Sequence, residues 1–164
     1  MAGFLDSLRC ELVPRCLAKT HVTILPPRPL ASGLPENAWN ELNDSLNRFP
    51  PFRVELTSVE VFAGTNVIYI SIGAGHRELE QMHAALNQGP LKFAEPYQYH
   101  PHVTLAQQLS AEQVEAAAAL ARRHWREFSH SRSFTVDRLT FVQNTEENRW
   151  ADLAARALSI RKAS

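Results

Sequence analysis

The tripeptide His-Val-Thr occurs twice in this chain, at residues 21–23 and 102–104, and each copy precedes an apolar residue, Ile24 or Leu105. One copy is expected by chance in about two chains per hundred of this composition, so coincidence explains two copies poorly. Side chains alternate along a β-strand, which places the His and Thr of each copy on one face and the apolar residues on the other. The repeat therefore predicts two strands, each with a polar face for chemistry and an apolar face for a core.

The size and charge of the chain limit the classes of protein to consider. A length of 164 residues suits one domain. Its 17 basic and 17 acidic residues are dispersed, so we expect no binding to duplex DNA. Cys10 and Cys16 lie on different faces of an expected helix, which argues against a disulfide. Residues 1–11 resemble neither a signal peptide nor a membrane span, so we expect a cytoplasmic protein that does not contact a membrane.

Helical spacing of apolar residues recurs in four segments. It predicts helices over residues 3–16, 36–49, 76–88 and 110–128. The second of these begins after Pro35, and the third ends at Gly89 and Pro90. The fourth opens with Ser110 three residues before Gln113, which is the pattern of a capping box.

Segments rich in β-branched and aromatic residues lie between these helices. They predict strands over residues 18–25, 52–62, 65–73, 102–107 and 133–143, with a hairpin turn at Ala63 and Gly64. Residues 144–148 resemble a turn, and residues 149–158 are expected to return as a strand, although their alanines are also compatible with a helix. Helices mixed with antiparallel strands indicate an α+β fold. The order of motif strand, helix and strand pair occurs twice, which suggests a duplicated layout.

The two motifs together supply the groups that phosphodiester chemistry needs. One imidazole of the pair His21 and His102 can take a proton from the attacking oxygen, and the other can give a proton to the leaving oxygen. The hydroxyls of Thr23 and Thr104 can donate to the non-bridging phosphate oxygens. No carboxylate cluster near either motif demands a metal ion, so we expect no metal and no other cofactor.

With these residues, the chain resembles the 2H phosphoesterases, whose two His-x-Thr-apolar motifs lie about this far apart. The resemblance extends over residues 3–158, and the eight motif residues carry most of it. It implies a bilobal, pseudo-two-fold fold in which antiparallel sheets flanked by helices enclose an active-site groove between the lobes. It also implies metal-independent action on 2′,3′-cyclic phosphates or 2′-5′ linkages of a small nucleotide or an RNA end. The resemblance does not choose between hydrolysis and ligation.

Two features depart from the family's pattern. Relatives usually begin with a strand before the first helix, so the first lobe of this chain would lack an edge strand or take one from a partner. The protein would then be a monomer, or a dimer formed through its N-terminal region. Many relatives also have a basic residue shortly after the second motif, where this chain has Gln107 and Gln108. We expect Arg28, just after the first motif, to supply the missing positive charge.

Further candidates lie next to the second motif. His100 can share a strand face with His102, and Tyr99 can stack on a base, so both are candidate substrate-binding residues. Two alternatives remain open at this point. One is a zinc site made by His21, His100 and His102. The other is a groove that binds nucleotides or RNA ends without turning them over.

Overall fold

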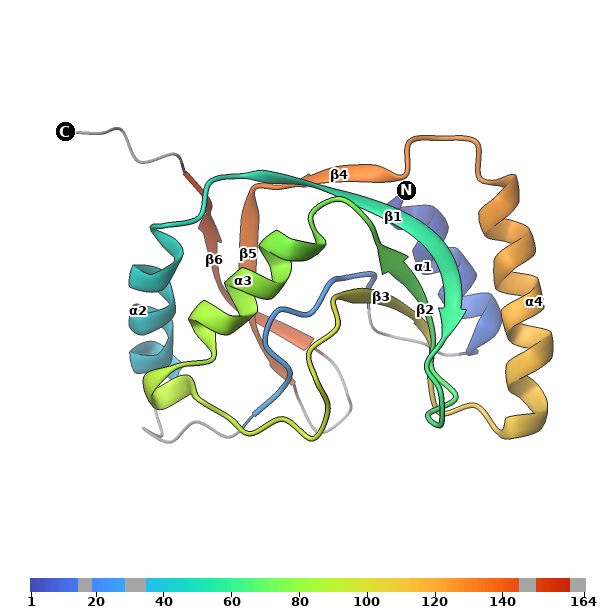
Figure 1. Ribbon diagram of the computed structural model, residues 1–164, viewed down its shortest axis with the longest axis horizontal. Coiled ribbons are helices and arrows are strands. Elements are labelled where there is room, and N and C mark those ends of the chain that lie inside the picture. Colours follow the sequence, from blue (N-terminus) through green and yellow to red (C-terminus); the bar gives the residue numbers. More distant parts are fainter. Residues whose placement is uncertain (15–18, 29–34, 145–149, 160–164) are drawn as a thin grey trace. The chain divides into compact units, whose positions relative to one another are not determined.

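The computed structural model describes residues 1–14, 19–28, 35–144 and 150–159. Within these residues, helices and antiparallel strands alternate irregularly along the chain (Figure 1), so the predicted α+β class is confirmed. The helices are α1 (Ala2–Leu12), α2 (Pro35–Leu46), α3 (His76–Leu86), the 3-10 helix η1 (Gly89–Leu91) and α4 (Ala111–Glu127). The strands are β1 (Phe52–Val61), β2 (Ile68–Ile72), β3 (His102–Ala106), β4 (Ser133–Val136), β5 (Arg138–Asn144) and β6 (Trp150–Ala157).

The strands form two sheets. One has four strands in the order β3-β2-β1-β4, and the other is the antiparallel pair β5-β6. The chain divides into two compact units, and the expectation of a single two-lobed domain stays a prediction. Unit 1 comprises Met1–Thr23, Glu55–Ala74 and Pro101–Ser133, and unit 2 comprises Ile24–Val54, Gly75–His100 and Phe134–Ser164.

The core of unit 1 forms around β2, the strand between β1 and β3. Four of the five β2 residues are buried, because β2 has a hydrogen-bonded neighbour on both sides. Helix α1 contacts both β3 and α4 (Figure 1), and it buries Leu5, Leu8 and Leu12. The indole N–H of Trp125 on α4 donates to the Thr57 carbonyl of β1 at 2.6 Å. A buried polar group of this kind needs such a partner, so the bond helps to fix α4 on the sheet.

Unit 2 is built on the contact between α2 and α3 and on the β5-β6 pair. The two helices bury one apolar stripe each, consisting of Ala38, Leu42, Leu46, Leu79, Met82 and Leu86. Gly75, the residue before α3, has φ of 86°, and a Cβ there would lie 2.6 Å from the Arg53 carbonyl oxygen. Only glycine fits this position, because of both the positive φ and the close backbone.

The four helices, the hairpin of β1 and β2, and the final strand β6 confirm the corresponding predictions from sequence. The predicted strand over residues 133–143 is wrong in one respect, because it is divided at Asp137. The part before Asp137 joins the four-stranded sheet, and the part after it pairs with β6. Alternation of apolar residues continues through the change of partner, so it does not reveal the break. Most of the predicted turn at residues 144–148 lies outside the described residues.

The prediction of a strand around the first motif is wrong. Residues 19–25 contain no strand, and residue 18 lies outside the described part. The N–H and the hydroxyl of Thr20 both donate to a carboxylate oxygen of Asp6 on α1, at 2.7 and 2.5 Å. Because these bonds go to a side chain, the segment is held without a β-ladder. Pro26 and Pro27, which follow, have no N–H to offer to one.

The capping box of α4 allows a test of local stability. Ser110 and Gln113 bond reciprocally, and the Ser110 N–H donates to the Gln113 side chain at 3.0 Å. We expect Ser110→Ala to lower the free energy of unfolding by about 1 kcal/mol, because the Gln113 N–H loses the Ser110 side chain as an acceptor. Urea denaturation would measure the difference, and Ser110→Thr should retain most of the stability.

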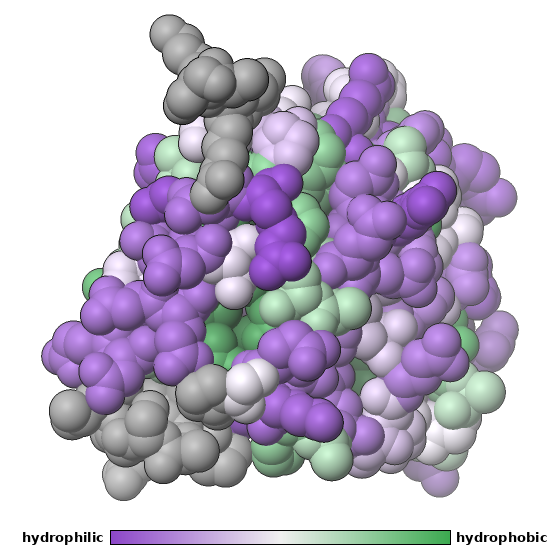
Figure 2. Space-filling view, turned by 60° about the vertical axis from the view of Figure 1, so that its left-hand side comes forward, coloured by the Kyte–Doolittle hydropathy of each residue, from purple (hydrophilic) through white to green (hydrophobic). Residues whose placement is uncertain are grey.

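Hydrophilic residues cover most of the face seen in Figure 2. Among the described residues, the exposed large hydrophobic side chains are Tyr97, at 76% exposure, and Leu153, at 44%. None of the described helices has both the length and the apolar content needed to cross a bilayer.

Candidate functional site

The second motif lies on β3 and has the predicted alternation. Val103 and Leu105 are buried, whereas His102 and Thr104 are half-buried on the other face. Both polar residues have a cross-strand neighbour on β2, with Ser71 opposite His102 and Tyr69 opposite Thr104. The ladder therefore fixes which side chains surround the second histidine.

The first motif has no ladder, yet its histidine has a defined tautomer. The Nδ1 atom of His21 lies 2.6 Å from the Lys19 carbonyl oxygen. A carbonyl oxygen only accepts, so Nδ1 carries the hydrogen, and Nε2 of the neutral ring holds the lone pair. His21 is exposed, whereas Thr23 is half-buried. The exposed ring presents a nitrogen that can accept a proton.

All four predicted catalytic residues belong to unit 1, because the division of the chain falls directly after Thr23 and directly before Pro101. The two motifs, which are 81 residues apart between His21 and His102, are thus in one compact unit and not in one unit each. The predicted substrate-binding residues Arg28, Tyr99 and His100 belong to unit 2.

Two aromatic rings pack against His102. Phe62 and Tyr69 stack with ring centroids 3.8 Å apart, and the His102 ring meets them edge-on at 4.9 and 5.4 Å. Burial raises the pKa of the Tyr69 phenol, and the charge and the hydrogen bond of Glu60 raise it further. Tyr69 is therefore a neutral donor at physiological pH, and its hydroxyl donates to Glu60 at 3.3 Å.

A cluster of hydroxyl groups surrounds the other oxygen of Glu60. The Ser58 hydroxyl donates to Glu60 Oε1 at 2.7 Å, and the Ser71 hydroxyl lies 3.2 Å from the same oxygen. Ser71 Oγ is also within hydrogen-bond distance of Thr57 Oγ1, at 2.8 Å. Since Ser71 is the cross-strand neighbour of His102, this cluster of Thr57, Ser58, Glu60 and Ser71 lies beside the second histidine. Sequence reasoning did not identify it.

The side chain of Arg9 on α1 bonds to the backbone of the second motif. Arg9 is buried, at 5% exposure, and its Nη1 donates to the Thr104 carbonyl oxygen. Sequence reasoning also missed this contact. A signal was present, because Arg9 is four residues from Leu5 and three from Leu12, within an apolar stripe.

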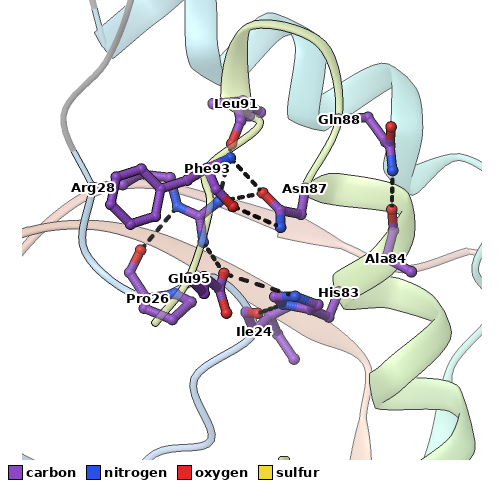
Figure 3. Close-up of polar contacts among 10 residues, drawn as sticks. All are labelled: Ile24, Pro26, Arg28, His83, Ala84, Asn87, Gln88, Leu91, Phe93 and Glu95. Atoms are coloured by element: carbon purple, nitrogen blue, oxygen red, sulfur yellow. Dashed lines mark hydrogen bonds and ion pairs between the residues drawn. The ribbon is translucent and has the colours of Figure 1, made fainter. Parts of the chain in front are cut away.

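Arg28 lies in a buried network (Figure 3). Its guanidinium donates to Glu95 at 2.7 Å, to Asn87 at 2.7 Å and to the Leu91 carbonyl at 2.9 Å. A fourth bond goes to the Pro26 carbonyl at 3.0 Å, and only 5% of the side chain is exposed. The geometry therefore favours an internal structural role, and it does not support the prediction that Arg28 is the cation for a phosphate.

The other two predicted substrate-binding residues also have partners within unit 2. Tyr99 stacks face to face on His83, with centroids 3.9 Å apart and planes at 3°. Burial raises the pKa of the Tyr99 phenol, with smaller contributions from Glu95 and Glu80, so the phenol is neutral at physiological pH. His100 is exposed, and its ring meets His76 edge-on at 5.5 Å. One face of Tyr99 is thus covered, and His100 remains accessible.

His83 links the end of the first motif to α3. Its Nδ1 lies 2.7 Å from the Ile24 carbonyl oxygen, and its Nε2 lies 3.7 Å from Glu95 (Figure 3). The carbonyl requires a hydrogen on Nδ1. His83 and Arg28 therefore both contact Glu95. The bond from His83 to the Ile24 carbonyl also holds the end of the first motif against α3.

The zinc alternative requires a cluster of metal-ligating side chains. No group of three or more His, Cys, Asp or Glu side chains in the described part of the chain is arranged to share a metal ion. Of the three histidines in this alternative, His21 and His102 belong to unit 1 and His100 to unit 2, so the zinc site stays a hypothesis.

Comparison with known proteins identifies the family of this chain. A family model described as the 2′-5′ RNA ligase superfamily matches residues 6–148. A “Putative phosphoesterase” of Bacillus cytotoxicus is 29% identical over 135 residues, which cover 82% of this chain and 76% of the relative. Proteins of the same description from Bacillus licheniformis and Halalkalibacterium halodurans are each 25% identical, over 82% of this chain and 77% and 76% of their own. The chain belongs to the 2′-5′ RNA ligase superfamily, and the resemblance to 2H phosphoesterases is confirmed.

Proposed function

We propose that this protein is a metal-independent phosphodiesterase that acts on 2′,3′-cyclic phosphates or 2′-5′ linkages of nucleotides or RNA ends. The observation that carries the proposal is the pair of His-Val-Thr motifs within one compact unit. Membership of the superfamily and the phosphoesterase names of the relatives support it. The proposal also includes a fold with pseudo-two-fold symmetry and an active-site groove. In this groove, the side chains of both motifs contact the same phosphate.

The chemistry assigned to this site balances without a cofactor. One histidine takes a proton from water as its oxygen attacks the phosphorus of a 2′,3′-cyclic phosphate. One ribose P–O bond breaks, and the other histidine gives a proton to the oxygen that leaves. Thr23 and Thr104 donate to the non-bridging oxygens, where negative charge increases in the transition state. The product is a 2′- or 3′-phosphomonoester.

A panel of substrates tests this proposal. Purified protein is incubated with 2′,3′-cyclic nucleotides, 2′-5′ dinucleotides and ADP-ribose cyclic phosphates, with and without a chelator, and the products are identified. We expect turnover of at least one of these classes, unchanged by the chelator. Binding of several of these phosphates with no product would support the non-catalytic alternative, and loss of turnover in chelator would contradict a metal-independent reaction.

A further inference from the structure

Glu60 is a carboxylate in contact with two neighbours of His102. Its Oε2 accepts from the Tyr69 hydroxyl at 3.3 Å, and its Oε1 lies 3.2 Å from the Ser71 hydroxyl. The Tyr69 ring packs against the imidazole of His102, and Ser71 is opposite His102 in the ladder. All of these residues are in unit 1.

The face of the sheet that holds His102 also holds this carboxylate. Tyr69 is opposite Glu60 on one side and opposite Thr104 on the other. Residues that are opposite one another in an antiparallel ladder project to the same face. Glu60, Tyr69 and Thr104 are therefore a row across three strands, and His102 shares their face as a neighbour of Thr104.

Three further groups near this row could also influence the charge of His102, namely Tyr69, Arg9 and Arg122. Tyr69 on β2 stays neutral at physiological pH because burial raises its pKa. Arg9 on α1 directs its guanidinium to the Thr104 carbonyl, and Arg122 on α4 donates to the Val59 carbonyl at 3.3 Å. Both cations are thus bonded to backbone oxygens, whereas Glu60 is bonded to side chains that neighbour the His102 ring. Opposite charges nearby favour the charged form of an imidazole.

We propose that Glu60 is a positioning residue that favours protonated His102, and that His102 is therefore the general acid and His21 the general base. This assignment rests on the proposed function, which leaves the two roles open. His21 suits the complementary role, because the hydrogen on its Nδ1 is donated to the Lys19 carbonyl, and the lone pair of the neutral ring is then on Nε2.

The test combines an NMR titration with a pH–rate profile. In Glu60→Gln, we expect the midpoint of the His102 ring titration to move to lower pH by about half a unit, since a solvent-exposed charge is partly screened. The His21 midpoint stays in place. The high-pH limb of kcat/KM, which reports the acid, moves down with His102, and the low-pH limb does not move. The spectrum of His102→Ala assigns the resonance.

Glu55→Gln is the matched control, because Glu55 is an exposed carboxylate on the same strand. It should leave both the His102 titration and the profile unchanged. A third variant, Tyr69→Phe, keeps the ring against His102 and removes the hydroxyl that bonds to Glu60. We expect a shift of His102 in the same direction as in Glu60→Gln, and a smaller one.

The outcomes separate this inference from the proposed function. An unchanged His102 titration in folded Glu60→Gln overturns the role of Glu60. Movement of the low-pH limb instead of the high-pH limb overturns the assignment of His102 as the acid. If no substrate of the panel is turned over, the proposed function fails, and the NMR titration still decides whether Glu60 sets the charge of His102. Because Glu60 is exposed, the variant should fold, which a thermal melt would verify.

Discussion

His102→Ala and His21→Ala are each expected to reduce turnover of a 2′,3′-cyclic nucleotide at least about a hundredfold, the low end for loss of a general acid or base. The reduction should fall on kcat more than on KM, because each ring acts mainly in the transition state. The two losses should not multiply in the double variant, since removing one partner already disables the concerted transfer of protons. Steady-state kinetics of the three variants measure all of these effects.

His130→Ala is the control for this prediction. His130 is an exposed histidine of unit 1 and contacts Phe128 edge-on, outside both motifs. The control should keep full activity. Near-complete activity in either motif variant would mean that the assigned proton transfers are wrong, whatever the control shows.

Arg28→Met is expected to lower the free energy of unfolding by about 3 kcal/mol, the low end for breaking a buried ion pair. Glu95 has an exposed side-chain fraction of only 11%. Without Arg28, its carboxylate would lose a charged partner at a place where water replaces that partner poorly. Asn87 and the Leu91 carbonyl would lose a donor as well. Chemical denaturation with a fluorescence readout gives the free energy of unfolding.

Two further variants test whether this loss of stability comes from the broken ion pair with Glu95. Arg48 is exposed and bonds to the Ser45 carbonyl in the same unit, so Arg48→Met should change stability by less than about 0.5 kcal/mol. Adding Glu95→Leu to Arg28→Met should recover part of the loss, because it removes the uncompensated charge. A cost below about 1 kcal/mol for Arg28→Met would show that water already reaches this network. Arg28 would then regain its place as a candidate for the phosphate.

The fold was largely predictable where one local rule decided the structure. The stripe of Leu79, Met82 and Leu86 and the capping box of Ser110 each determine a helix within a few turns of chain. The first motif was not predictable in this way. Its residues have the composition of a strand, but a strand needs a neighbouring ladder, and here the Thr20 N–H bonds to a side chain 14 positions earlier.

Within the candidate site, only the residues of the repeated His-Val-Thr motif were predictable from the sequence. The repeat indicated His21, Thr23, His102 and Thr104, and their catalytic roles remain predictions. The position of Arg28 shortly after the first motif suggested a phosphate ligand, yet its partners Asn87 and Glu95 lie 59 and 67 positions away. Glu60 and Ser71 were missed for the same reason, because only the register of three strands brings them beside His102.

The bond from Arg9 to the carbonyl of Thr104 spans 95 positions of the chain. Through this bond, α1 stabilises the second motif, which is synthesised much later than the helix. A version of the protein trimmed at its amino end beyond this arginine should therefore lose more than a peripheral helix. The nascent chain, in turn, cannot complete the surroundings of Thr104 until both distant segments have left the ribosome.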